Sequence, residues 1–272
     1  MLNRRLLLDA TEVRVAQVRC DGHERRWGGA EEVSALGLVL IRAGVFRRRV
    51  NGVDSVLDPT MAYLQRPGEI QQMTHPAGGD VCTSVTISPE LGDRLGAAGL
   101  FRITPEVDLA HRQLVSRAVR GADPVELADR AAEVVGAVLA EPVPVPRSRL
   151  IEDARALLSA QPALPLTRLA TELGVSAWYL SRTFHRATGV TLSRYRRRLR
   201  ARAALEQFVD GASAGMVGDT LADLAAQLGF ADQAHLCRAL RAEHGRSPTA
   251  LRALLSPPHP AGRARTPRRG SR

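Results

Sequence analysis

Residues 221–245 read LADLAAQLGFADQAHLCRALRAEHG, and residues 166–189 read LTRLATELGVSAWYLSRTFHRATG. Each stretch begins with apolar residues at helical spacing and then reaches a glycine, which permits the positive φ of a tight turn. A helix-capping residue follows, Ser176 in one stretch and Asp232 in the other, and it introduces a second periodic segment. The same helix, turn and helix are therefore predicted twice, with second helices at residues 177–188 and 233–244.

A helix, a glycine-containing turn and a second helix form a unit with which many proteins read the major groove of DNA. Charge supports that interpretation, because residues 147–272 carry 21 Arg and 9 acidic residues, whereas residues 1–146 carry 17 Arg and 19 acidic residues. All 38 basic residues are arginine, a bias that a GC-rich genome alone could produce. A purely structural helical repeat is the alternative. Two units in register within a half of charge +12 predict sequence-specific DNA binding.

The repeated stretches resemble the two halves of the AraC/XylS-family DNA-binding domain, over about residues 148–254. The residues that carry the resemblance are Leu169-Ala170, Gly174-Val175-Ser176, Leu180-Ser181-Arg182-Thr183-Phe184 and Gly189, then Leu224-Ala225, Gly229-Phe230-Ala231-Asp232, Leu236-Cys237-Arg238-Ala239-Leu240, Gly245-Arg246-Ser247-Pro248 and Arg252. Two positions depart from the family pattern: Leu240 replaces the usual Phe, and Leu251 a common Tyr.

The resemblance implies seven helices, among them a long helix that joins two helix-turn-helix units in successive major grooves of double-stranded DNA. It also implies a transcription regulator that is more often an activator than a repressor, with RNA polymerase as a partner. The N-terminal domain would then be cupin-like, and would bind a small effector or mediate homodimerisation.

By its resemblance to the family, the first recognition helix faces the bases with Trp178, Ser181 and Arg182. The second does so with Gln233, Ala234, Cys237 and Arg238. Arg182 suits bidentate pairing with guanine, and Gln233 suits adenine. The alternatives are a phosphate or intramolecular contact for Arg182, partial burial for Trp178, and simple packing for Cys237.

Six arginines lie between positions 194 and 202, beside apolar positions of the predicted connecting helix. Guanidinium groups bind phosphate oxygens through paired hydrogen bonds, which position a protein on DNA without reading its sequence. The predicted phosphate contacts are Arg194, Arg196, Arg197 and Arg200. A solvated basic helix face is the alternative for each of them.

The N-terminal half has the pattern of an antiparallel β-barrel or sandwich with helices beside it. Residues 36–41, 45–50 and 81–87 are rich in β-forming residues and are separated by Gly, Pro, Asn and Asp. Residues 106–120 and 124–140 then change to helical periodicity, and their apolar stripes fit either a dimer interface or packing on the barrel. The predicted class is α+β multidomain, with a cupin-like β-barrel and flanking helices before an all-α domain.

Alternating prolines at residues 141–147 predict an extended linker between the two domains. The predicted domains are residues 1–140, cupin-like and responsible for effector binding or dimerisation, and residues 148–256, which bind DNA. Residues 257–272 form a basic tail with the composition of disorder. The glycine-rich segment at 209–219 is longer than the family pattern and predicts a looser joint between the two units.

Cys20, His75 and Cys82, with His23 near the first, are chemically able to bind a metal. They are scattered over about sixty residues without tight ligand spacing, so core or loop positions are the favoured interpretation. We therefore expect no metal, no cofactor and no enzymatic activity. The competing hypotheses are a metal-dependent cupin enzyme, a DNA-repair alkyl acceptor, and a nonspecific architectural DNA binder. No apolar run is long enough to span a bilayer and no signal peptide is evident, so a cytoplasmic protein is expected.

Overall fold

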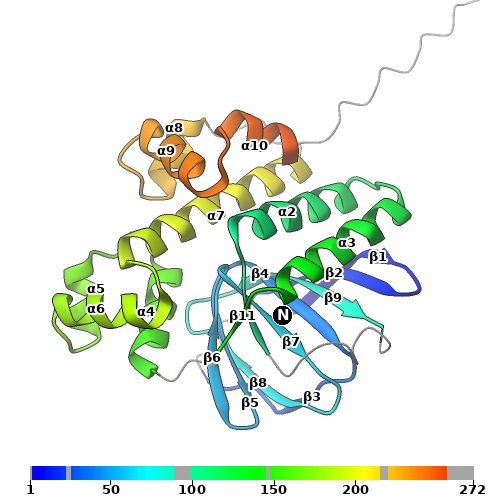
Figure 1. Ribbon diagram of the computed structural model, residues 1–272, viewed down its shortest axis with the longest axis horizontal. Coiled ribbons are helices and arrows are strands. Elements are labelled where there is room, and N and C mark those ends of the chain that lie inside the picture. Colours follow the sequence, from blue (N-terminus) through cyan, green and yellow to red (C-terminus); the bar gives the residue numbers. More distant parts are fainter. Residues whose placement is uncertain (1, 23–25, 89–98, 145–147, 215–219, 256–272) are drawn as a thin grey trace, which may run out of the picture.

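The computed structural model describes residues 2–22, 26–88, 99–144, 148–214 and 220–255. An N-terminal domain of antiparallel sheets packs against a C-terminal domain of helices (Figure 1). The predicted α+β multidomain class is confirmed, with two antiparallel sheets and flanking helices before an all-α domain.

Two sheets build the N-terminal domain, and every strand pair in them is antiparallel. The larger sheet has the order β1 (Leu2–Asp9), β2 (Val13–Cys20), β9 (Asp80–Ile87), β4 (Gly37–Ala43), β7 (Met61–Gln65), β10 (Leu100–Arg102) and β11 (Pro142–Val143). The smaller sheet has the order β3 (Glu31–Glu32), β8 (Ile70–Thr74), β5 (Phe46–Val50) and β6 (Val53–Leu57). The three β-rich segments predicted from the sequence correspond to β4, β5 and β9.

Buried side chains from both sheets meet inside the domain. Phe46 and Leu57 of the smaller sheet pack with Ile41 and Tyr63 of the larger one, and the rings of Phe46 and Tyr63 meet edge to face at 6.2 Å. An edge-to-face pair is a favoured aromatic geometry. The space between the sheets is therefore occupied by core side chains.

Helices α2 (Pro105–Val119) and α3 (Pro124–Leu139) cover the larger sheet (Figure 1). Asp123 caps α3 by accepting hydrogen bonds from two backbone N–H groups, and Pro124 occupies the first turn. Helix α2 is buried on two sides, because Leu114 packs in the sheet core while Val115 packs in a core of the helical domain. Packing within one chain thus accounts for the apolar stripes of both helices.

Seven helices form the described part of the C-terminal domain: α4 (Arg149–Ala160), α5 (Leu166–Glu172), α6 (Ala177–Thr188), α7 (Leu192–Ala214), α8 (Leu221–Gln227), α9 (Gln233–His244) and α10 (Pro248–Leu255). They enclose two cores, one around Leu180 and Phe184 and one around Leu236 and Leu240. Leu240 and Leu251, the two departures from the family pattern, are fully buried. At both positions, leucine therefore takes the place of the aromatic residue in the core.

The structure differs from the sequence prediction at two joints. Pro142–Val143, placed in the linker by the sequence, is an edge strand whose residues pair with Leu100 and Phe101. An edge strand tolerates proline because one side needs no ladder hydrogen bond. Helix α7 continues to Ala214, so the first part of the segment 209–219 is helical. Residues 215–219 and the tail 257–272 lie outside the described residues.

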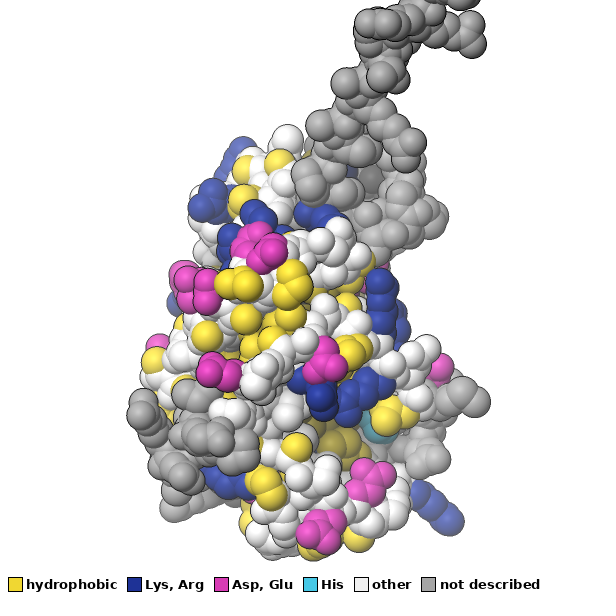
Figure 2. Space-filling model, turned by 90° about the vertical axis from the view of Figure 1, so that its right-hand side faces the viewer, with side chains coloured by type: hydrophobic (Ala, Val, Ile, Leu, Met, Phe, Trp, Pro, Cys, Tyr) yellow, Lys and Arg dark blue, Asp and Glu magenta, His cyan; other side chains and the backbone are white. Residues whose placement is uncertain are grey.

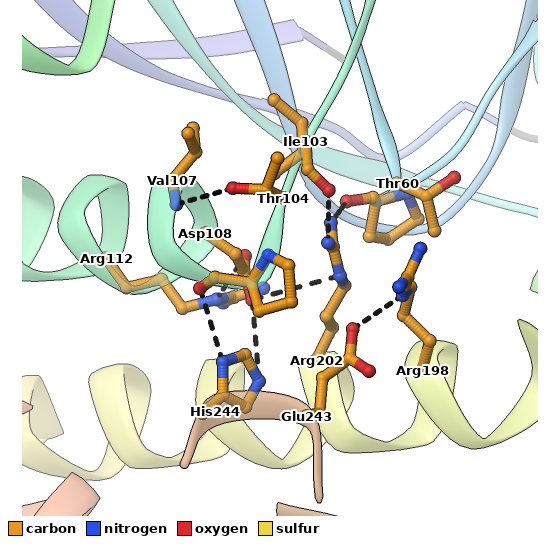
Figure 3. Close-up of polar contacts among 12 residues, drawn as sticks. Thr60, Ile103, Thr104, Val107, Asp108, Arg112, Arg198, Arg202, Glu243 and His244 are labelled. Atoms are coloured by element: carbon orange, nitrogen blue, oxygen red, sulfur yellow. Dashed lines mark hydrogen bonds and ion pairs between the residues drawn. The ribbon is translucent and has the colours of Figure 1, made fainter. Parts of the chain in front are cut away.

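Buried ion pairs fasten α7 to the N-terminal domain near the second helix-turn-helix unit. Glu206 of α7 accepts from Arg42 of β4 at 2.6 Å and also from Arg112 of α2, whose Nε donates to Asp108 at 3.0 Å. Burial alone would raise the pKa of Glu206, but the two guanidinium groups hold it below its ordinary value. Beside them, buried Arg202 of α7 donates to the carbonyl of Ile103 at 2.6 Å (Figure 3).

A second buried cluster fastens the first unit. Asp58, in the turn before β7, accepts from Arg155 of α4 at 2.7 Å and from the hydroxyl of Tyr195 in α7. Burial would raise the pKa of Asp58, yet Arg155, Thr60 and Tyr195 lower it. Tyr195 also packs edge to face on Phe184 of α6. Both units are therefore tied to the β domain through buried charges.

Replacing Glu206 with alanine should leave the guanidinium groups of Arg42 and Arg112 buried without their shared carboxylate. Breaking a buried ion pair from one side costs about 3–5 kcal/mol, and we expect the free energy of unfolding to fall by that amount in urea titrations. Asp9→Ala, which removes an exposed ion pair with Arg14, should cost under about 1 kcal/mol. Equal losses for the two variants would contradict the buried clamp.

Buried His111 gives the stability a dependence on pH. Burial, reinforced by the charges of Arg42 and Arg112, lowers its pKa from 6.5 to about 3. As the pH falls below 6.5, His111 takes up a proton in the unfolded chain but stays neutral in the folded chain. Its contribution to the free energy of unfolding is therefore fully present above that pH and is lost as the pH falls toward 3. His111→Leu should reduce the slope between about pH 5.5 and 4 by about 1.4 kcal/mol per pH unit, measured from unfolding free energies. An unchanged slope would rule out this role for His111.

Candidate nucleic-acid interface

Two recognition helices are built in the same way. The glycine after the first helix of each unit has a positive φ, 67° at Gly174 and 69° at Gly229. A residue with a side chain would be strained in this backbone conformation. The capping residue then accepts from a backbone N–H three positions on, at 3.2 Å for Ser176 and 2.6 Å for Asp232. The predicted helices at 177–188 and 233–244 are confirmed as α6 and α9.

Each recognition helix buries one face and presents the other. On α6, Leu180 and Phe184 are fully buried, whereas Trp178 is 67% exposed and Arg182 is exposed. The guanidinium carbon of Arg182 lies 4.7 Å from the centroid of the Trp178 ring, so the two side chains form one cation–π pair. Ser181 is half-buried beside them.

On α9 the corresponding division is simpler. Leu236 and Leu240 are buried, whereas the predicted contact residues Gln233, Ala234 and Arg238 are exposed and Cys237 is half-buried. All seven positions predicted to face DNA bases therefore reach solvent, three on α6 and four on α9. Tyr179, next to Trp178, is also 50% exposed but was not among the predicted contact residues. Its position in the helical period does not show whether the side chain is exposed or buried.

The arginines of α7 divide between the surface and the interior. Arg194 is exposed and Arg197 half-buried, and neither side chain makes a hydrogen bond or ion pair with the described residues. Arg198 instead donates to Glu243 of α9 at 2.6 Å, and Arg202 is buried against the β domain (Figure 3). The basic run is therefore only partly available to phosphates.

Arg196 and Arg200, the other two predicted phosphate contacts, also bind backbone carbonyls. Arg196 donates through Nε to Pro162 at 3.0 Å. Arg200 donates to Gly229 at 2.6 Å and stacks on Phe230 at 4.5 Å, so it holds the turn of the second unit against α7. Their intramolecular contacts were not predicted, because a sequence does not show which carbonyls a helix will meet.

Helix α7 lies between the two units, with α5 and α6 beside its first turns and α8, α9 and α10 along the rest of it (Figure 1). Helix α7 has 23 residues, a length of about 34 Å. Figure 2 views the molecule from the side away from α5 and α6. Basic and acidic side chains are mixed with apolar atoms on that face, so it presents no continuous basic surface.

Two hollows lie between the β domain and the first unit, rather than between the two sheets. One, of about 750 Å³, is bounded by Arg47 and the turn from His75 to Gly78 on one side, and by α4 and α5 on the other. A neighbouring hollow of about 580 Å³ includes Trp27 and Arg49. These hollows are places where a small molecule could contact both domains.

The structure also brings together some of the scattered metal candidates. Ligand atoms of Cys20 and His75 lie within 4.8 Å of each other and of a carboxylate oxygen of Asp80, which the sequence did not single out. Cys82 contacts the same aspartate, because its thiol donates to Oδ2 at 2.9 Å. Strand pairing, invisible in the spacing, aligns Cys20 with Asp80. His23 lies outside the described residues.

The comparisons with known proteins agree with this geometry. A family model described as a helix-turn-helix domain matches residues 169–253. No curated protein matches the chain. No helix among the described residues has the length and apolar character to cross a membrane.

Three similar solved structures are of low identity. ToxT from Vibrio cholerae is 13% identical, with 90% of this chain and 99% of that chain covered and a TM-score of 0.38. The C-terminal domain of AraT, a response regulator from Geobacillus stearothermophilus, is 23% identical, with 39% and 85% covered and a TM-score of 0.35. A cupin superfamily protein from Desulfitobacterium hafniense is 15% identical, with 32% and 77% covered and a TM-score of 0.28.

The assignment rests on the family match and on the paired geometry. Two capped recognition helices stand on one long connecting helix, each with a buried apolar face and a polar outer face. The motif residues that carry the family resemblance lie in α5, α6, α8, α9 and α10 and in the turns between these helices. Residues 169–253 therefore form a helix-turn-helix domain of the kind that binds DNA in transcription regulators, and their motifs resemble those of the AraC/XylS family.

Proposed function

We propose that this chain is a sequence-specific transcription activator that acts in the cytoplasm and is not an enzyme. The observation that carries the proposal is the pair of recognition helices with different outer side chains, Trp178 and Arg182 on one and Gln233 and Arg238 on the other. Base reading needs distinct side chains at each contact, whereas an architectural protein that only bends DNA does not. RNA polymerase is the partner expected of an activator.

In this proposal α6 and α9 enter successive major grooves on one side of the duplex. Successive grooves are about 34 Å apart, so this arrangement requires that separation between the two helices. Helix α7 contacts both units within its first turns, through Tyr195 and Phe184 of α6 and through Arg198 and Glu243 of α9, and these contacts support a fixed relation between the units.

The base contacts are assigned to Trp178, Ser181, Arg182, Gln233, Ala234, Cys237 and Arg238, all of which reach solvent. Phosphate contacts are assigned to Arg194, Arg196, Arg197 and Arg200. Arg194 and Arg197 are the stronger candidates for phosphate binding, because Arg196 and Arg200 already donate hydrogen bonds to backbone carbonyls.

Residues 1–140 are assigned to effector binding or homodimerisation, and residues 148–256 to DNA binding. The hollow of about 750 Å³ between the turn at His75 and helices α4 and α5 supports an effector site that touches both domains. An effector there would bias DNA binding by its difference in affinity between two domain arrangements. Light scattering with and without DNA tests the homodimer.

The test of the proposed function is binding to the DNA upstream of the chain's own gene. We expect a shifted complex that survives excess competitor DNA, and an affinity that falls steeply as salt is raised, because phosphate contacts release counterions. Equal affinity for the upstream region and for shuffled DNA of the same composition would overturn sequence-specific binding and leave an architectural role.

Arg182 and Arg197 should fail in different ways when replaced by alanine. Arg182→Ala should cost about 1–3 kcal/mol on the preferred site and relax specificity at one base pair, because a bidentate guanine contact is lost. Arg197→Ala should weaken binding to all sequences equally and reduce the salt slope by about one. Titrations of the site, its single-base variants and competitor DNA over a range of salt measure both effects, and identical behaviour of the two variants would contradict these roles.

A further inference from the structure

A mixed cluster of sulfur, nitrogen and oxygen ligands lies at one end of the larger sheet. Cys20 is the last residue of β2 and Asp80 the first of β9, and the two are direct partners in the antiparallel register. Opposite residues in such a pair project from the same face of a sheet. His75 joins them from the turn that follows β8 of the other sheet. Both sheets therefore supply the cluster.

One carboxylate oxygen of Asp80 is directed into this cluster. Asp80 is 94% buried, since its exposed fraction is 6%. Its Oδ2 accepts from the Cys82 thiol at 2.9 Å, which fixes the carboxylate. Its Oδ1 lies 2.9 Å from Nε2 of His75, but the contact is not aligned as a hydrogen bond, and Oδ1 has no hydrogen-bond partner among the described residues. A buried polar atom without a partner is costly unless another group binds it.

The backbone leaves room beside the other two ligands. A β-carbon added at Gly22 would lie 3.1 Å from Sγ of Cys20 and 3.2 Å from Nδ1 of His75. The ring of Phe46 packs against His75 at 5.8 Å and limits where the imidazole can turn. The thiol and the imidazole thus face a space that any side chain at position 22 would reduce.

We propose that Cys20, His75 and Asp80 bind one divalent zinc-like cation, through Sγ, a ring nitrogen and Oδ1. Thiolate, imidazole and carboxylate are the three ligand types that zinc takes in proteins, and three protein ligands leave a fourth position for water or a small anion. Cys82 holds Asp80 in place as an outer partner rather than as a ligand.

The geometry needs only a small contraction. Ligand atoms around tetrahedral zinc are about 3.5 Å apart. The three ligand atoms here lie within 4.8 Å of one another, so side-chain rotations that move each atom by about an ångström would bring them to the ion. On binding, the proton of the Cys20 thiol passes to solvent and the thiolate binds the cation, with no change in oxidation state. His75 also borders the hollow against α4 and α5, which gives the ion a way in.

The first experiment titrates Co²⁺ into the full chain, prepared without an affinity tag, reduced and freed of metal. We expect one equivalent to bind with a thiolate-to-cobalt charge-transfer band, and Zn²⁺ to displace it. Cys20→Ser should abolish the band, while His75→Gln and Asp80→Asn should weaken binding more than the 10- to 100-fold that an outer partner typically costs. Cys237→Ser and His185→Gln, matched changes on the recognition helices, should leave the titration unchanged.

Two further variants separate binding from folding. Cys82→Ala should weaken binding roughly 10- to 100-fold by releasing Asp80. Gly22→Ala removes no ligand, yet it should weaken binding because the methyl group occupies the space between the thiol and the imidazole. Thermal melts of the metal-free proteins identify any variant that does not fold. The proposal is overturned if no charge-transfer band forms in the unaltered chain, if the band survives Cys20→Ser, or if it is lost with Cys237→Ser.

The unaltered protein supplies a test that needs no substitution. Cys20 and Cys237 are both half-buried free thiols, so each is open to alkylation in the metal-free chain. Zn²⁺ should protect Cys20 from alkylation while Cys237 continues to react, as followed by peptide mass mapping. Equal labelling of the two cysteines with and without Zn²⁺ would overturn the site.

Discussion

The fixed relation between the two domains depends on two buried carboxylates where the helices meet the sheets, Glu206 of α7 and Asp58 of the β domain. Glu206 neutralises two buried arginines from β4 and α2, and Asp58 neutralises a third from α4. Charges removed from water are costly when unpaired, so the domains can separate only if each guanidinium regains solvent. These ion pairs therefore anchor α7 and α4 to the β domain.

The same helix has a second role on its other side. Arg198 and Arg200 of α7 bind α9 and the turn before it, while Tyr195 packs on Phe184 of α6. The basic run is thus divided among domain anchoring, assembly of the units and solvent-facing positions suited to phosphate.

The turn from His75 to Gly78 contacts both the hollow against α4 and α5 and the cluster of Cys20, His75 and Asp80. It borders the hollow against α4 and α5, and its histidine lies beside Cys20 and Asp80. A cation at that cluster and a molecule in that hollow would both act on this one turn. The turn faces the first helix-turn-helix unit, whose outer side chains include the Trp178 and Arg182 pair.

The sequence by itself determined the local features: two capped helix pairs with their glycine turns, the family signature, the proline-started helix α3 and the β-rich segments. Their signals lie within a few residues, because caps, turns and periodicity act over one or two helical turns. Only the tertiary structure decided which arginines are buried, since Arg202 and Arg197 look alike in a basic helix until Ile103 supplies a carbonyl to one of them. It likewise brought Cys20, His75 and Asp80 together and placed Pro142–Val143 in the sheet, because strand register joins residues far apart in the chain.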